Sequence, residues 1–374
     1  MIKLGDVATY INGYAFKPED RGEVGLPIIR IQDLTGNAYD LGFYNGDYPK
    51  RIEINDGDVL ISWSASLGVY VWNRGRALLN QHIFKVEFDK VNIDKSYFVY
   101  AVRQKLAEMA MKTHGATMKH IVKKDFEETL IPYPSQKKQI EIGTNLDKIA
   151  NIIAARKQQL ELLDELVKAR FVELFGDAIY NDKGWENDTV EKLCKEIYGG
   201  GTPSKSHPEY YEDGDIPWVS SKDMKTDVLT DSQIKINQLG VDNSTARMVP
   251  INSVIMVIRS GILKHTLPVA INAVPITVNQ DLKVFIPNKR VLTRFLAIQF
   301  KMHEKDILSG VRAVTADNIE FNSLKQRELI VPPIELQQEY VTFLEQIDKS
   351  KVAIQKSLDE TQILFDSLMQ KYFG

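Results

Sequence analysis

A long helical segment occurs twice in this chain, and the repeat constrains the fold more than any other feature. The first copy is expected from Ser135 to Phe175 and the second from about Ile334 to Phe373. In both copies apolar residues recur at alternating steps of three and four, the spacing of a heptad seam. The first seam contains Leu146, Ile149, Ile153, Leu160, Leu163, Val167 and Leu174, and the second contains Leu344, Ile347, Ile354, Leu358, Phe365, Leu368 and Tyr372. A repeat of this kind predicts a duplicated architecture.

Both copies carry the same signals at their ends. The first follows the strand exit Leu130–Pro134 and the second follows Leu329–Pro333, so prolines mark the start of each helix. Both copies end on a Phe-Gly pair. Glycine after the last turn predicts a left-handed cap, at Gly176 and at Gly374.

Polar residues interrupt each seam. Arg156 and Arg170 interrupt the first, and Lys351 and Thr361 interrupt the second. Two interpretations remain open. Each helix packs separately on its own globular domain, or the two helices pair as a two-stranded coil with the basic stems at its edges.

Length and composition limit the class of protein. A chain of 374 residues is expected to contain more than one domain. No run approaches 18 consecutive apolar residues, and Met1–Asp6 is no signal peptide, so no membrane partner is expected. The lone Cys194 excludes a disulfide framework and favours a cytoplasmic location. Because the net charge is −3, any nucleic-acid binding requires basic groups concentrated on particular faces.

The segment before the first helix reads as a mixed α/β domain. Strands are expected at Pro27–Ile31, Val59–Ser64, Val69–Trp72 and His82–Val86, with a turn at residues 33–37. An amphipathic helix is expected at Tyr97–Lys112, followed by a basic loop at residues 113–124.

The pattern restarts after the polar connector Asn181–Gly184. Asp223 stands six residues after Pro217, as Asp33 does after Pro27, and Asn279-Gln280 repeats Asn80-Gln81. The repeating unit is therefore a globular domain plus a long helix, with diverged globular halves. We expect the boundaries to be 1–134 and 177–332 for the domains and 135–176 and 333–374 for the helices.

Motifs for catalysis are missing. The sequence has no P-loop, no Gly-x-Gly-x-x-Gly after a strand and no His-Glu-x-x-His, and its six histidines lack zinc-ligand spacing. The fragment Asp281–Lys283 resembles part of a nuclease site, but its counterpart His82–Phe84 lacks both charged groups. No catalytic residue, metal or cofactor is therefore predicted.

Polar residues suited to binding occur on loops and strand ends of both halves. In the first half they are Arg30, Trp63, Ser64, Ser66, Arg74, Asn80, Gln81, Lys112, Lys119 and Lys123. In the second they are Thr202, Ser204, Lys205, Ser220, Ser221, Lys222, Arg259, Lys264, Asn279 and Gln280. Lys and Arg neutralise phosphates, hydroxyls hold register, and Asn, Gln or Arg contact base edges, so double-stranded DNA is the predicted ligand. The alternative is that these residues are ordinary solvated loops.

The helix length suits a split DNA site. The seam from Leu146 to Leu174 spans roughly 43 Å at about 1.5 Å per residue. One turn of B-DNA is about 34–36 Å, so two half-sites slightly more than a turn apart are expected.

Several short motifs, in their order and duplication, resemble the specificity (S) subunit of type I restriction-modification enzymes over essentially the whole chain. They are Leu4–Val7, the Pro-x-x-x-x-Gln segments Pro134–Gln139 and Pro333–Gln338, the Gly200–Pro203 loop, and both Asn-Gln pairs. The first half departs from this pattern, because Gly13–Phe16 stands where the second half has Gly-Gly-Thr-Pro.

The resemblance implies an α/β (α+β) fold in which two target-recognition domains are separated by two long conserved helices, paired as an antiparallel coiled coil. It implies a non-catalytic subunit whose domains each read one half of a bipartite site. It also implies two modification (methyltransferase) subunits as partners, with restriction subunits in the full complex. The alternatives are a coiled-coil scaffold that assembles partners without reading DNA, and a self-sufficient nuclease or methyltransferase.

Overall fold

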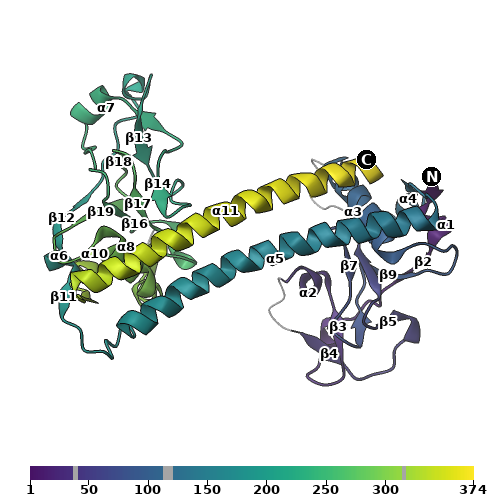
Figure 1. Ribbon diagram of the computed structural model, residues 1–374. Coiled ribbons are helices and arrows are strands. Elements are labelled where there is room, and N and C mark those ends of the chain that lie inside the picture. Colours follow the sequence, from purple (N-terminus) through teal and green to yellow (C-terminus); the bar gives the residue numbers. More distant parts are fainter. Residues whose placement is uncertain (37–40, 113–120, 314–316) are drawn as a thin grey trace. The chain divides into compact units, whose positions relative to one another are not determined.

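The computed structural model describes residues 1–36, 41–112, 121–313 and 317–374 (Figure 1). The chain forms two compact units. Unit 1 consists of Met1–Gln158 and Ile354–Gly374, and unit 2 of Gln159–Ala353. The boundary falls inside both long helices, so each unit holds one globular part and one end of each helix.

Unit 1 contains two four-stranded sheets and a two-stranded ribbon. The first sheet is antiparallel, in the order β2 (Thr9–Asn12), β9 (Ile83–Glu87), β6 (Val59–Ser62) and β7 (Gly68–Val71). The second has the order β4 (Gly42–Tyr44), β3 (Leu26–Ile29), β8 (Ala77–Leu79) and β5 (Glu53–Ile54). Its central pair, β3 and β8, is parallel. The ribbon pairs β1 (Ile2–Lys3) with β10 (Leu130–Ile131).

Helices pack against both sheets of unit 1. They are α1 (Leu4–Val7), α2 (Ile31–Thr35), α3 (Lys95–Lys112), α4 (Lys123–Glu127) and the ends of the two long helices. α3 confirms the amphipathic helix, and it buries Tyr97, Phe98 and Val102 in the core. The last turns of the C-terminal helix pack on α3, where the rings of Tyr100 and Phe365 lie 5.9 Å apart (Figure 1).

Unit 2 repeats this plan. Its larger sheet has the order β12 (Cys194–Gly199), β19 (Leu282–Pro287), β16 (Val254–Val257), β17 (Val269–Asn272) and β14 (Val228–Leu229). Its smaller sheet has the order β15 (Lys235–Ile236), β13 (Ile216–Val219) and β18 (Thr277–Val278), with β13 and β18 parallel. Two ribbons pair β11 (Asn187–Thr189) with β22 (Glu328–Ile330), and β20 (Arg312–Ala313) with β21 (Asp317–Asn318).

The short helices of unit 2 are α6 (Val190–Leu193), α7 (Gln238–Asp242), α8 (Thr293–Met302), α9 (Glu304–Ser309) and α10 (Phe321–Lys325). α8 holds the position that α3 has in unit 1. Its Phe295 stacks on Phe171 of the first long helix at 5.9 Å, and Tyr340 of the second long helix completes this aromatic cluster.

The two long helices are α5 (Gln136–Phe175) and α11 (Ile334–Phe373), so the predicted pair of long helices is confirmed. Within unit 2 they run in opposite directions, since Asp164 pairs with Lys351 at 2.5 Å and Arg170 pairs with Glu339 at 2.7 Å. Among the predicted seam residues none is exposed. The helices pair with each other, as the second interpretation predicts. Residues of both helices also pack on the globular part of each unit, so the interpretation that each helix packs separately was wrong.

The polar interruptions of the seams find partners in the opposite helix. In unit 1 the Arg156 guanidinium donates to the Thr361 hydroxyl and to the backbone carbonyl of Ser357. One interruption therefore satisfies the other, and the cost of burying a polar group in the seam is offset by a hydrogen bond.

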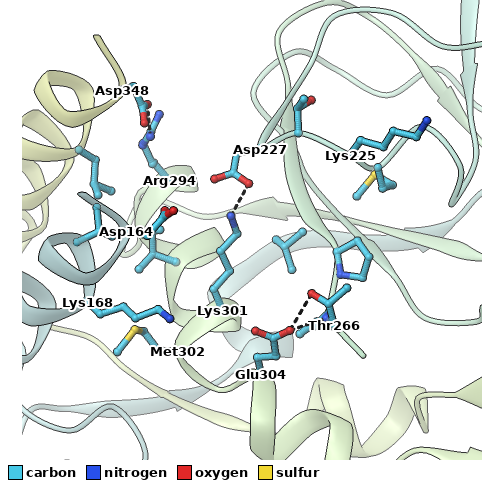
Figure 2. Close-up of a pocket in the computed structure, with 18 of the residues that line it drawn as sticks. Asp164, Lys168, Lys225, Asp227, Thr266, Arg294, Lys301, Met302, Glu304 and Asp348 are labelled. Atoms are coloured by element: carbon cyan, nitrogen blue, oxygen red, sulfur yellow. Dashed lines mark hydrogen bonds and ion pairs between the residues drawn. The ribbon is translucent and has the colours of Figure 1, made fainter. Parts of the chain in front are cut away.

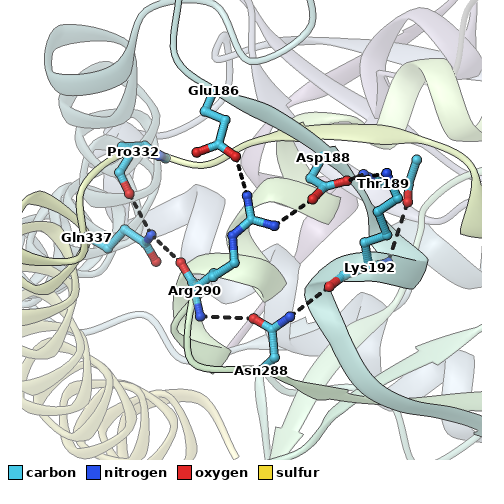
Figure 3. A network of polar contacts seen from close by, with 8 residues as sticks. All are labelled: Glu186, Asp188, Thr189, Lys192, Asn288, Arg290, Pro332 and Gln337. Carbon is cyan, nitrogen blue, oxygen red and sulfur yellow. Dashed lines mark hydrogen bonds and ion pairs between the residues drawn. The ribbon is translucent and has the colours of Figure 1, made fainter.

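A buried glutamine joins each long helix to its globular part. Gln337 accepts a hydrogen bond from the Leu292 amide at 3.0 Å and donates to the carbonyls of Arg290 and Pro332 (Figure 3). Gln338, the residue expected to match Gln139, is exposed. The alignment of Pro333 and Gln338 with the first motif was therefore wrong by one residue, and Pro332 with Gln337 is the true match.

Three local predictions were also wrong. The first strand ends at Ile29, and the expected turn is helix α2, because the Asp33 carboxylate accepts from the Arg30 amide at 2.8 Å and caps it. Lys123 lies in α4 and not in a loop. Gly176 has the left-handed φ of +78°, but Gly374 does not. Within the described residues, no helix combines the length and apolar character needed to cross a membrane.

Candidate nucleic-acid interface

In each unit one sheet contains a pair of parallel strands, β3 and β8 in unit 1 and β13 and β18 in unit 2. The carboxyl ends of these two strands meet at one edge of that sheet. In unit 1 the Asn80 amide donates to the Ile29 carbonyl at 3.0 Å, so the residues after β3 and β8 are neighbours. In unit 2 the Asn279 amide donates to the Val219 carbonyl at 2.9 Å in the same way. We call these positions the strand-end edge of each unit. The predicted Asn-Gln pairs both lie on it.

A glycine crosses the strand-end edge in both units. A Cβ on Gly200 would lie 1.9 Å from the Val278 carbonyl oxygen, and one on Gly13 would lie 2.0 Å from that of Asn80. Gly13 therefore gives the first half the same close backbone approach, although it lacks the Gly-Gly-Thr-Pro sequence. The adjacent loop is anchored in unit 2 by a hydrogen bond from the Thr202 hydroxyl to the Gln280 side chain.

Besides the Asn-Gln pair, the predicted basic and polar side chains of unit 2 lie on three segments: one that follows the crossing Gly200, one that follows β13 and one that follows β16. Lys205 and Lys222 are exposed, beside Ser204 and Ser221. Ser220 is held by Asp223, which accepts from its hydroxyl at 2.7 Å. Lys264 is exposed and lies 3.7 Å from Asp317.

The centre of the strand-end edge of unit 2 is a connected set of three side chains. The Arg259 guanidinium donates to Asp281 at 2.7 Å, and the buried Asn279 amide donates to the other oxygen of the same carboxylate at 3.1 Å. Asp281 was considered above only as part of a nuclease-like fragment. Its position directly after the Asn-Gln pair was the sequence signal for a role at this edge.

The strand-end edge of unit 1 is built differently. Asp33 lies 3.1 Å from the Arg30 Nε, and its backbone carbonyl accepts from Arg74 at 2.8 Å, so two arginines converge beside Asn80. Arg74 also covers the ring of Trp72 at 4.7 Å. Two cations suit phosphate contact, whereas the buried Trp72 ring, only 3% exposed, supports Arg74 from below and does not itself reach a ligand.

The remaining predicted residues of unit 1 divide between exposed and buried positions. Gln81 and Ser66 are exposed, whereas Ser64 is only 7% exposed and lies too deep for direct contact with a ligand. Trp63 stacks on Phe84, and Lys123 donates to the Tyr10 carbonyl at 2.8 Å. Lys119 and the side chain of Lys112 lie outside the described residues.

No catalytic arrangement accompanies these edges in the part of the chain that the structure describes. It contains no group of three or more histidine, cysteine, aspartate or glutamate side chains able to hold a metal ion. In the nuclease-like fragment, the Lys283 ammonium lies 4.6 Å from the centre of the Phe321 ring and burial lowers its pKa. Asp281 is occupied by Arg259, so the two groups do not share a site.

Unit 2 also contains an open cleft of about 630 Å³ between α8 and the long helices. Each of its carboxylates has a hydrogen-bond or ion-pair partner. Lys301 pairs with Asp227 at 2.5 Å, Arg294 pairs with Asp348, and Glu304 accepts from Thr266 at 3.0 Å (Figure 2). Since every acid named here has a partner, this cleft does not provide a free general base.

The two units share one scaffold, and their described residues assemble no metal-binding cluster. A model of the type I restriction modification DNA specificity domain matches residues 1–163 and 182–362, and the chain belongs to this family.

Relatives from two organisms extend the comparison. The Escherichia coli EcoR124I/EcoR124II type I restriction enzyme specificity subunit is 32% identical over 59% of this chain, and the match spans about half of that protein, 54%. The E. coli EcoBI specificity subunit is 22% identical over 99% of this chain and 83% of its own length. The MjaIX specificity subunit of Methanocaldococcus jannaschii is 23% identical over 95% and 91%.

Solved structures show the same fold. The S subunit of the type I restriction-modification system from M. genitalium matches with a TM-score of 0.61 at 14% identity, over 100% of this chain and 95% of that one. A chain from a study of complex assembly and conformational transition of the type I R-M system matches with a TM-score of 0.59 at 15% identity, over 100% and 96%.

Proposed function

We propose that this chain is the non-catalytic DNA-recognition subunit of a type I restriction-modification complex. Each globular part, residues 1–134 and 177–332, acts as a target-recognition domain that reads one half of a bipartite site. The spacer helices, residues 135–176 and 333–374, set the separation of the half-sites and dock two methyltransferase subunits. Restriction subunits join the full complex, which acts on DNA in the cytoplasm.

The observation that carries this proposal is the pair of strand-end edges. Both are built from parallel strand ends and a crossing glycine, yet their exposed side chains differ. Because the two units share a scaffold but expose different side chains, they are better suited to two different half-sites than to two copies of one ligand. Family membership supports the same function, since the relatives above are specificity subunits of restriction enzymes.

A charge-reversal experiment tests the proposal against a scaffold that assembles partners without DNA. Lys205→Glu with Lys222→Glu reverses two exposed cations of the unit 2 edge. Lys195→Glu with Lys289→Glu is the matched control. These exposed lysines lie where β12 begins and just after β19 ends, at the end of this strand pair that is away from the strand-end edge. Binding of duplex DNA by the complex with its methyltransferase subunits is measured against salt concentration.

The first pair is expected to weaken binding and to lower the slope of log affinity against log salt by about 2, because each phosphate contact releases about 0.9 counterion. The control pair is expected to leave that slope unchanged. Equal affinity for the two variants would favour the scaffold. Methylation by the wild-type complex without regard to sequence, or at a continuous site, would also refute the proposal.

A further inference from the structure

The guanidinium of Arg259 is held on one side and open on the other. Its Nε and Nη2 both approach Oδ1 of Asp281, at 2.7 and 2.6 Å. These two nitrogens form one edge of the planar group, so the Nη1 hydrogens and the outer Nη2 hydrogen point away from the carboxylate. Among the described residues no other group accepts from the Arg259 guanidinium. Its side chain is 48% exposed, while that of Asp281 is 24% exposed.

The carboxylate is itself fixed. Asn279, only 7% exposed, donates from its side-chain amide to Oδ2 of Asp281 and accepts from the Asp281 backbone amide, both at 3.1 Å. Asn279 is in turn held by its backbone bond to Val219. The direction of the guanidinium is therefore set by the strand ends, and little rotamer freedom is lost when it meets a ligand.

The open side of the guanidinium presents a fork of parallel N–H donors. Two parallel donors from arginine match the O6 and N7 acceptors of guanine in the major groove, and each such pair discriminates strongly against the other bases. A phosphate also accepts such a fork. Removal of the arginine side chain changes the recognised sequence if its ligand is guanine, but only the affinity if its ligand is phosphate, so the two ligands are distinguishable by an alanine substitution.

Unit 1 lacks this arrangement. The Trp63 amide donates to the His82 carbonyl as the Ile258 amide donates to that of Asp281, which places Ser64 and His82 where unit 2 has Arg259 and Asp281. Ser64 is buried and carries no charge. At this position, therefore, unit 2 has an arginine fork and unit 1 has none.

We propose that Arg259 reads a guanine in the half-site recognised by unit 2, with Asp281 and Asn279 as positioning residues. This inference rests on the proposed function and adds a base and a residue to it. It assigns one guanine to the half-site read by unit 2 and assigns no base to the half-site read by unit 1.

The test compares Arg259→Ala, Arg259→Lys and Asp281→Asn in the complex with its methyltransferase subunits, by mapping methylated sites on random duplex DNA. Arg259→Ala is expected to lose about ten- to hundred-fold preference for guanine at one position, and Arg259→Lys is expected to lose less, because lysine can also donate to O6 and N7. Asp281→Asn is expected to lose less at the same position. The other half-site and the gap stay unchanged, which also shows that the variants fold.

The matched control is Arg290→Lys. Like Arg259, Arg290 is held by acidic side chains, in this case the two carboxylates of Glu186 and Asp188 (Figure 3). Arg290 follows β19, whereas Asp281 precedes that strand, so the two arginines lie at opposite ends of it. Its substitution is expected to leave the recognised sequence intact. An unchanged recognised sequence in Arg259→Ala would mean that Arg259 does not contact a base, and would overturn the inference.

A change in the DNA provides a second test that does not depend on folding of a variant. Replacing that guanine by 7-deazaguanine removes the N7 acceptor, and should weaken binding by the wild-type complex but not further weaken binding by Arg259→Ala. Equal affinity of the wild type for both duplexes overturns the inference. If the wild-type complex has no split site at all, the proposed function fails first; a split site that all Arg259 variants preserve rejects only this inference.

Discussion

Gln139 and Gln337 hold equivalent buried positions in the two units, at 1% and 0% exposure. The Gln139 side chain accepts from the Asp94 amide at 3.0 Å and donates to the Pro134 carbonyl at 2.9 Å. Gln337 makes the same pair of contacts, with Leu292 and Pro332. In each unit one side chain therefore joins the start of a long helix to the residues just before α3 or α8.

Gln337→Ala is expected to lower the free energy of unfolding by about 1–3 kcal/mol, because it leaves the buried Leu292 amide and two carbonyls without a partner. Gln338→Ala is the matched control, one residue away but exposed, and should change stability by less than about 0.5 kcal/mol. Equilibrium unfolding in urea measures both. If the two variants were equally destabilised, the reassigned motif would be wrong.

Inserting seven residues after Gln158 in α5 and after Ala353 in α11 tests the spacer role. Both points lie at the unit boundary, so the packing inside each unit is disturbed least. Seven helical residues add roughly 10.5 Å, which corresponds to about three base pairs of rise. The gap between half-sites, read from mapped methylation sites, is expected to lengthen by that amount.

The control for this insertion is the same heptad placed in α5 alone. One insertion cannot keep both the Arg156–Thr361 contact of unit 1 and the Asp164–Lys351 pair of unit 2 in a continuous seam, so loss of activity is expected rather than a longer gap. An unchanged gap in the double insertion would show that the helices do not set the spacing.

Gly200→Ala should destabilise the protein by about 1–3 kcal/mol, because its Cβ would meet the Val278 carbonyl oxygen at 1.9 Å and backbone would have to shift. Gly13→Ala should do the same in unit 1. Gly261→Ala is the matched control, since no atom lies within 4 Å of the added carbon. Thermal unfolding of the three variants checks the comparison, and a harmless Gly13→Ala would argue against the shared role of the two glycines.

The Glu53 carboxylate is expected to make stability depend on pH in acid. Hydrogen bonds from the Arg76 guanidinium and then from the Tyr48 hydroxyl lower its pKa to about 2. Because the folded pKa lies below the ordinary value of 4.5, its stabilising effect is present above about pH 4.5 and is lost as pH falls toward 2.

The corresponding measurement is urea unfolding of wild type and Glu53→Gln at about pH 6 and pH 3. The variant should be less stable than wild type at the higher pH, and the difference should shrink at the lower. Glu23→Gln, an exposed change outside this contact, serves as the control. A difference that stayed constant with pH would contradict the assignment.

Much of the fold was accessible from the sequence because heptad spacing and β-strand alternation are local patterns. The two seams, helix α3 and the strands β6, β7 and β9 follow from such patterns. The prediction of a turn at residues 33–37 was wrong because it also used only local patterns. The cap that Asp33 supplies to α2 depends on one side chain folding back on the backbone.

The candidate site was less accessible. Asn80 and Asn279 could be placed together with their strand ends because the repeat offset aligned them. That Ser64 is buried, and that Asp281 holds Arg259, depend on packing between segments distant in sequence. The periodicity of a sequence does not indicate which of several polar residues will be buried in the folded chain.

The sequence by itself determined the duplication, the length of the helices and the divergence of the two halves, because each is a property of residue order. Only the tertiary structure decided that Arg156 meets Thr361, that Gln337 and not Gln338 joins helix to domain, and that one arginine is held with its fork open. These depend on distances of a few ångströms between residues far apart in the chain, and such distances exist only after the units have packed.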